Sequence, residues 1–76
     1  MDWAGRISSN PAVLGGRPVI AGTRVPVQII VGALSEGETL DDVCEGYGIS
    51  DQDVKAALAY AAEAVDYAAI YLVSGR

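Results

Sequence analysis

The chain has 76 residues, of which 51% are hydrophobic, and five Lys and Arg against ten Asp and Glu leave a net charge of −5 at pH 7. A single domain over residues 1–76 buries only about 60% of the surface that its unfolded chain exposes, so a stabilising partner surface is expected. The acidic balance argues against general affinity for nucleic acid. The chain has neither an apolar run long enough for a membrane span nor a signal-peptide pattern, so we expect a cytoplasmic protein without a membrane partner.

Turn residues divide the first 25 residues into short extended segments. Residues 6–9 have the composition of a strand, which an Asn-Pro pair then ends. Residues 12–14 and 18–20 are apolar and flank a Gly-Gly-Arg loop that needs positive φ, so they are expected to pair as a small hairpin. The prediction is therefore a strand and turn region over residues 6–25, followed by a helical region over residues 26–76.

Two short helices are predicted after this first region. Pro26 is placed as the first residue of a helix, and Gly37 has the place of its carboxyl cap. The apolar residues of this helix fall at i, i+3, i+4 and i+7: Val27, Ile30, Val31 and Leu34. Thr39, with an Asp three residues later, caps a second helix over residues 40–47, which Gly48 ends.

The third predicted helix is the longest. Ser50, with Asp53 three residues later, has the same capping pattern, and no Gly or Pro interrupts residues 51–74. At 1.5 Å per residue this helix is roughly 35 Å long, which is more than a small domain needs to cover its core. Its end is therefore expected to project from the domain.

Two apolar stripes run along this third helix. The first consists of Val54, Leu58, Ala61, Val65, Ala68 and Leu72, and the second of Tyr60, Ala64, Tyr67 and Tyr71. The first stripe fits the core and its continuation into the seam of a homodimer. The second is rich in tyrosine, which is enriched at interfaces, so it fits a partner surface. The alternative is that the tyrosines cover a larger core.

Charge is segregated along the chain. Residues 1–35 hold one Asp against three Arg, a net charge of +2, whereas residues 36–76 hold nine acids against two bases, a net charge of −7. The second and third predicted helices have the spacing of a helix-turn-helix, whose second helix enters the major groove by its first residues. Here those residues are Asp51, Gln52 and Asp53, so direct base reading by this helix is disfavoured.

The first half of the chain therefore holds the candidates for phosphate contact. These are Arg6, Arg17 and Arg24, with Thr23 beside the last of them on a bend that Gly22 permits. The alternative is that the arginines of the turns lie in solvent or pair with a carboxylate. Either way, any DNA contact is expected through these residues and not through the acidic half.

The residue types needed for catalysis or metal binding are scarce. The chain has no His, and Cys44 is its single cysteine, so neither a thiol–imidazole pair nor the usual zinc ligands can be assembled. Acidic residues are concentrated at helix starts, where they complement the helix dipole. We therefore expect no metal, no cofactor and no enzyme activity.

Several motifs together carry a resemblance to a known family. They are Asn10-Pro11, Leu14-Gly15-Gly16-Arg17-Pro18-Val19-Ile20, Gly22-Thr23-Arg24-Val25-Pro26-Val27, Gly37, and Asp53-Val54-Lys55-Ala56-Ala57-Leu58-Ala59-Tyr60-Ala61. Over about residues 6–65 the chain resembles the domain of unknown function 433 family. The resemblance implies a homeodomain-like helical fold and a role as a VapB-like antitoxin that partners a PIN-like ribonuclease toxin.

The resulting prediction is a mostly α, three-helix, homeodomain-like helix-turn-helix domain with a short N-terminal β-hairpin and a long C-terminal helix. The functional hypothesis is a homodimeric antitoxin of a type II toxin-antitoxin system, which binds a PIN-like toxin and operator DNA. The expected toxin surface consists of Tyr60, Tyr67, Tyr71, Leu72 and Arg76. The alternative is a structural or oligomerising helical module that binds no DNA.

Overall fold

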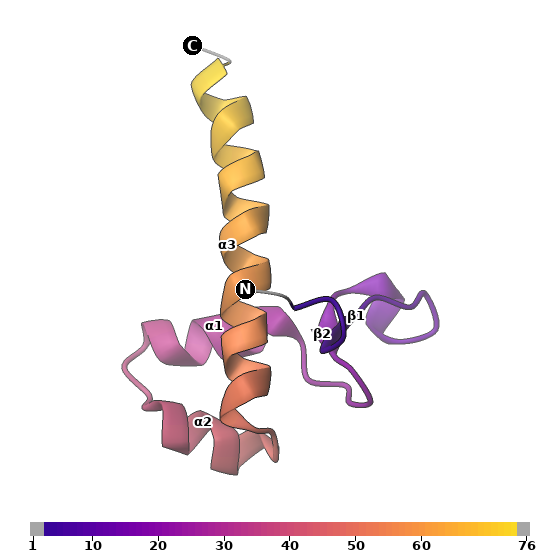
Figure 1. Ribbon diagram of the computed structural model, residues 1–76, viewed down its shortest axis with the longest axis vertical. Helices are drawn as coiled ribbons and strands as arrows, with labels where there is room; N and C mark the ends of the chain where they lie inside the picture. The colour runs from indigo at the N-terminus through magenta and orange to yellow at the C-terminus, as the bar shows by residue number, and fades with distance from the viewer. Residues whose placement is uncertain (1–2, 75–76) are drawn as a thin grey trace.

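A computed structural model describes the backbone of residues 3–74 and the side chains of residues 3–65. In chain order the elements are β1 (Ile7–Ser8), the 3₁₀ helix η1 (Leu14–Gly16), β2 (Val19–Ile20), α1 (Val27–Ser35), α2 (Leu40–Tyr47) and α3 (Asp51–Ser74). Figure 1 shows α1 and α2 beside the first half of α3, while the second half of α3 extends beyond them. This arrangement confirms the predicted fold class. Each helix in the described part of the chain is too short or too polar to cross a membrane.

The two strands form an antiparallel pair, but not the predicted one. Ile7 lies opposite Ile20, and Ser8 lies opposite Val19. The expected pairing of residues 12–14 with residues 18–20 is wrong, because Leu14 has a φ of 50° and is followed by two glycines that also have positive φ. A left-handed backbone cannot continue a strand. The observed pairing also buries two large side chains, since Ile7 and Ile20 are 8% and 2% exposed.

Helix α1 begins one residue later than predicted. Pro26 is its N-cap, with an extended backbone, and the Val27 amide donates to the carbonyl oxygen of Pro18 at 3.0 Å. The predicted core face is confirmed, since Val27 and Ile30 are buried and Val31 and Leu34 pack against the core. Gly37 has a φ of 99° and ends the helix as expected.

The predicted turn between α2 and α3 is confirmed. The Thr39 hydroxyl oxygen accepts a hydrogen bond from the Asp42 amide at 3.1 Å and caps α2. Gly48 has a φ of 67°, the left-handed conformation that this turn requires. Ile49 follows it and is buried in the core. The chain therefore reverses within a few residues, which brings α3 back against α2 and α1.

The buried face of α3 differs from the predicted stripe. Val54, Ala56 and Ala57 are at most 1% exposed, whereas Leu58 is 41% and Val65 is 64% exposed. The two alanines have little side chain to separate the helices, so α3 can pack closely against its neighbours through them. Alanine occurs on every side of this helix, so apolar spacing alone could not identify the face that packs.

The packing predicts that two substitutions that remove the same number of atoms lower the free energy of unfolding by different amounts. Ile30→Ala removes a fully buried side chain and should lower the free energy of unfolding by about 2–5 kcal/mol. Leu58→Ala changes an exposed side chain and should cost less than about 1 kcal/mol. Urea denaturation followed by circular dichroism would measure both. Equal costs would show that Leu58 belongs to the core after all.

Candidate functional site

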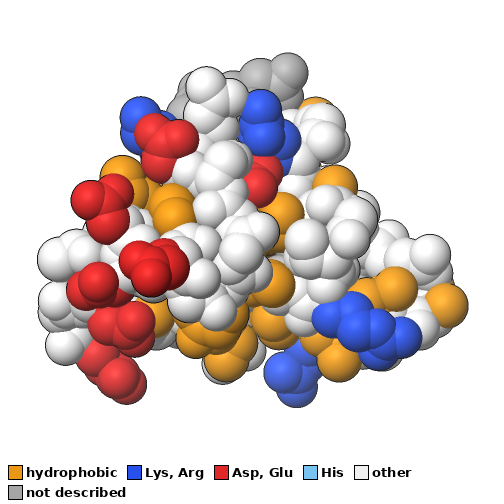
Figure 2. Space-filling view, turned by 90° about the horizontal axis from the view of Figure 1, so that it is seen from below, with side chains coloured by type: hydrophobic (Ala, Val, Ile, Leu, Met, Phe, Trp, Pro, Cys, Tyr) orange, Lys and Arg blue, Asp and Glu red, His pale blue; other side chains and the backbone are white. Residues whose placement is uncertain are grey.

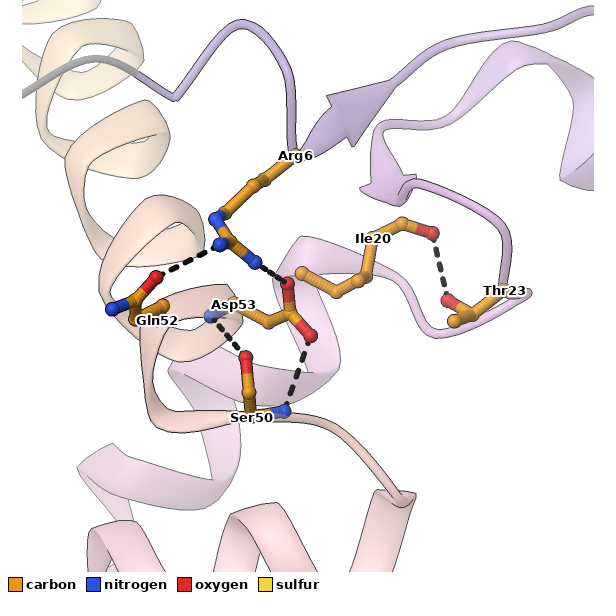
Figure 3. A network of polar contacts seen from close by, with 6 residues as sticks. All are labelled: Arg6, Ile20, Thr23, Ser50, Gln52 and Asp53. Atoms are coloured by element: carbon orange, nitrogen blue, oxygen red, sulfur yellow. Dashed lines mark hydrogen bonds and ion pairs between the residues drawn. The ribbon is translucent and has the colours of Figure 1, made fainter.

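The start of α3 is held by a network of polar contacts (Figure 3). The Ser50 amide donates to the Asp53 carboxylate at 3.1 Å, and the Asp53 amide donates to the Ser50 hydroxyl oxygen at 3.1 Å. This reciprocal pair is the predicted capping box. Arg6 then adds two contacts from the segment before β1, donating to Asp53 at 2.9 Å and to the Gln52 side-chain oxygen at 2.8 Å.

These contacts change the acidity of Asp53. Partial burial alone would raise its pKa. Hydrogen bonds from Ser50 and Arg6, together with the positive charge of Arg6, outweigh that effect and lower the pKa of Asp53 below 3.8. The carboxylate therefore stays ionised in the folded protein at any pH near neutrality.

The same network occupies the end of α3 that would read a DNA groove. Arg6, a predicted DNA-binding residue, is bound to the first turn of α3 through Asp53 and Gln52. Lys55 lies 3.9 Å from the Asp51 carboxylate in an exposed pair. The first turn of α3 thus presents acidic groups and side chains that already have partners, which is poorly suited to phosphate.

Thr23 is another predicted DNA-binding residue whose side chain is hydrogen-bonded within the domain. It stabilises the turn after β2. Its hydroxyl donates to the carbonyl oxygen of Ile20 at 2.8 Å and accepts from the amide of Val25 at 3.0 Å. Gly22 precedes it with a φ of 78°. The hydroxyl therefore shapes the loop that carries Arg24, and it is used by the loop itself.

Within the part of the chain that the structure describes, the side chains of Arg17 and Arg24, unlike that of Arg6, are free to bind a ligand. Both are exposed, and neither side chain forms a hydrogen bond or ion pair with another residue that the structure describes. Figure 2 shows basic side chains at the lower right, across from acidic side chains at the left, and further basic side chains at the top, beside acidic ones. The charge segregation seen in the sequence therefore persists over only part of this surface.

Two adjoining hollows, which sequence patterns did not indicate, lie along the exposed side of α1. One, of about 410 Å³, reaches toward the start of the helix and is lined by Leu14, Arg17, Pro26, Gln28 and Ile29. The other, of about 350 Å³, reaches toward its end and is lined by Gln28, Ile29, Gly32, Ala33, Glu36, Glu38 and Tyr47. Because the two hollows share Gln28 and Ile29, we treat them as one surface, the α1 face.

A third hollow, of about 400 Å³, lies between α1 and α3. All of its lining residues are uncharged, and they include Val27 and Val31 of α1 and Tyr60, Ala64 and Val65 of α3. It is located where α3 leaves the rest of the domain. An apolar surface therefore continues from the core onto the projecting part of α3.

The predicted toxin-binding residues divide into two groups. Tyr60 is partly buried, and its ring packs edge-on against the Trp3 ring with centroids 4.8 Å apart. The Trp3 indole N–H also donates to Glu63 at 2.6 Å, so this residue, which the sequence analysis did not single out, fastens the N-terminal segment to α3. The side chains of Tyr67, Tyr71 and Leu72 and the whole of Arg76 lie outside the described residues.

Cys44 has the surroundings of a structural thiol. Burial, followed by the negative charges of Asp51, Asp41 and Asp53, raises its pKa, so the nucleophilic thiolate is disfavoured. Across the part of the chain that the structure describes, no group of three His, Cys, Asp or Glu residues is placed to hold a metal ion.

Comparison with known proteins relates this chain to a family of unknown function. The family model described as "Protein of unknown function (DUF433)" matches residues 7–61. The uncharacterised protein y4eO of Sinorhizobium fredii is 34% identical over 47 residues, which are 62% of this chain and 21% of that protein. The crystal structure of Rv2018 from Mycobacterium tuberculosis aligns with a TM-score of 0.66 and 28% identity, covering 74% of this chain and 27% of that one. The matched part of each relative is thus only a small share of its length.

The lowered pKa of Asp53 predicts a specific loss of stability in acid. The ionised carboxylate stabilises the folded state above about pH 4, the pKa range of an unfolded Asp, and this contribution is lost as the pH falls through the lower folded-state pKa. Asp53→Asn should therefore lower the free energy of unfolding by about 1 kcal/mol at pH 7 and by much less at pH 2.5. Denaturant titrations at both values would measure this.

Asp42→Asn is the matched control, since Asp42 has the corresponding place in α2 and its carboxylate accepts no hydrogen bond from a described residue. It should change the free energy of unfolding little at either pH. An Asp53→Asn difference that is the same at pH 7 and pH 2.5 would contradict the assigned role of the charge.

Proposed function

The chain belongs to the DUF433 family, and we propose that it is an antitoxin-like protein that binds and neutralises a PIN-like ribonuclease toxin. The projecting end of α3 is the observation that carries this proposal. Ala61 is the last described residue that packs against the core, yet the helical backbone continues to Ser74. At 1.5 Å per residue, this continuation is about 20 Å long.

The sequence of the projecting segment supports a binding role. Residues 66–76 contain Tyr67, Tyr71 and Leu72, and Asp66 and Arg76 are the charged residues among them. Tyrosine offers a large contact area with few rotatable bonds to immobilise, and it is enriched among residues that dominate binding energy. Val65 is already 64% exposed where the segment begins. A toxin that covered this segment would remove apolar surface from water.

Neutralisation requires the bound segment to reach the active site of the toxin. In PIN-like ribonucleases, as the family resemblance implies, that site is rich in carboxylates. Arg76 follows the apolar segment and has the charge to pair with such a group. In this proposal the tyrosines supply the affinity and the arginine supplies the inhibition.

A triple substitution tests the toxin surface. Tyr67→Ala, Tyr71→Ala and Leu72→Ala together should weaken binding of the proposed PIN-like ribonuclease partner at least 100-fold, as expected for residues that dominate an interface. Titration calorimetry would measure the affinity, and cleavage of RNA would report neutralisation. Leu58→Ala is the control, since this residue is exposed on the part of α3 that lies within the domain.

Arg76→Ala separates the two roles, and should leave most of the affinity while relieving inhibition of the ribonuclease. If the triple variant binds as tightly as the original chain, the toxin surface lies elsewhere. If neither chain binds the toxin, the oligomerising helical module becomes the better hypothesis.

Operator DNA is a second candidate ligand. Arg17 and Arg24 favour it, because both are exposed and their side chains have no acidic partner among the described residues. Backbone contacts of this kind position a protein on DNA and make its affinity strongly dependent on salt. Arg6 and Thr23 contribute less in this proposal, since their polar atoms are occupied within the domain.

The salt dependence of operator binding tests this candidate. Arg24→Ala and Arg17→Ala should each weaken binding and reduce the slope of log affinity against log salt by about one for every phosphate group that the variant no longer neutralises. Gln52→Ala and Lys55→Ala at the start of α3 are the controls and should leave the slope unchanged. The opposite pattern, in which only the controls fail to bind, would place the DNA contact at α3.

A further inference from the structure

We propose that the α1 face is a homodimer interface, in which two copies pack α1 against α1 in antiparallel orientation about a two-fold axis. In this arrangement Arg17 of each subunit lies against Glu36 and Glu38 of the partner subunit. The inference is independent of the proposed binding of a toxin, because it uses a different surface. It competes with the proposed phosphate contact of Arg17, so in the dimer Arg24 is the arginine left for DNA. Three observations support it: exposed apolar side chains, a strained loop and a self-complementary charge pattern.

The first observation is that apolar side chains gather on the α1 face. Ile29 is 44% exposed although its neighbour Ile30 is fully buried, and Leu14 and Tyr47 are 42% and 39% exposed. Single exposed apolar residues are common, but these three line two hollows that adjoin at Ile29. Gly32 lines one of the hollows, and a side chain at this position would meet no atom within 4 Å. A second helix could therefore approach α1 closely.

The second observation is the backbone at Leu14. Its φ of 50° is in the left-handed region, which is unfavourable for a residue with a side chain. The turn is nevertheless held in place, since the Gly16 amide donates to the carbonyl oxygen of Val13 at 3.0 Å. The strained loop places a leucine on the surface beside Arg17 without burying it. A contact that covers Leu14 would compensate for this cost.

The third observation, the charge pattern, indicates that a second copy of this chain covers the α1 face. Arg17 lines the hollow at the start of α1, and Glu36 and Glu38 line the hollow at its end. Figure 2 shows basic side chains at the lower right and acidic side chains at the left, with hydrophobic side chains between these two groups. A two-fold axis near Ile29 and Gly32 would bring the basic end of each copy to the acidic end of the other. In an isologous interface every contact occurs twice, once from each subunit. Both ends of this face would therefore be paired with opposite charges in the dimer.

Charge reversal tests this interface without depending on how well either variant folds. The original chain should have twice the 7.9 kDa chain mass in light scattering at about 50 μM. Arg17→Glu alone, and Glu36→Arg with Glu38→Arg in a second chain, should each weaken self-association at least tenfold, since like charges then face each other. Mixing these two variants should restore a dimer with one copy of each, because all the facing charges become opposite again.

Two further variants serve as controls. Arg24→Glu makes the same charge change as Arg17→Glu at an exposed arginine that lines neither hollow, and should leave the dimer intact. Ile29→Asp places a charge at the centre of the face and should give a folded monomer by circular dichroism and light scattering.

Several outcomes would overturn the proposal. The first is that the original chain is monomeric at this concentration. The second is that a mixture of the two charge variants forms no mixed dimer in native mass spectrometry. The third is that Arg24→Glu weakens the dimer as much as Arg17→Glu does. If Ile29→Asp abolishes toxin binding while the original chain is monomeric, the face belongs to a different protein and not to a second copy.

Discussion

The carboxylate of Asp53 is the group on which the rest of the arrangement depends. It caps the first turn of α3 with Ser50, and through Arg6 it attaches the segment before β1 to that helix. Trp3 makes a second attachment to α3 near Tyr60. Trp3 and Arg6 thus attach the segment before β1 to α3, which holds the small sheet against that helix. A two-stranded sheet is marginal by itself, so these contacts give the strand region its place in the domain.

The parts of the fold that follow local rules could be predicted from the sequence. Thr39 and Gly48 determine where α2 begins and ends, and Ser50 determines where α3 begins. Each can be identified from its near neighbours in the sequence. The parts that depend on distant contacts could not be predicted. Arg6 and Asp53 are 47 positions apart, and nothing in their spacing connects them. The buried face of α3 could not be predicted for another reason. Alanine is found on all sides of that helix, so apolar spacing does not single out one face.

The candidate surfaces could be predicted less completely than the fold. Charge counting correctly separates a basic half from an acidic half of the sequence. It cannot distinguish Arg6, whose side chain has partners within the domain, from Arg17 and Arg24, whose side chains have none among the described residues. The α1 face could not be anticipated, because Leu14, Ile29 and Tyr47 come from three separate elements. The relatives that contain this domain are several times longer, so its surfaces also occur beside other parts of a chain.

The unbroken continuation of α3 from the core to Ser74 has a geometric consequence. Each residue of a helix turns it by about 100° and lengthens it by 1.5 Å, so the direction in which the far end points is tied to the number of residues before it. One residue inserted after Ala61 would turn every later position of the helix by more than a quarter of a turn, while leaving the residues that pack against the core in place. Seven inserted residues would nearly restore the direction. Family members that share a partner should therefore vary in this segment by whole helical repeats.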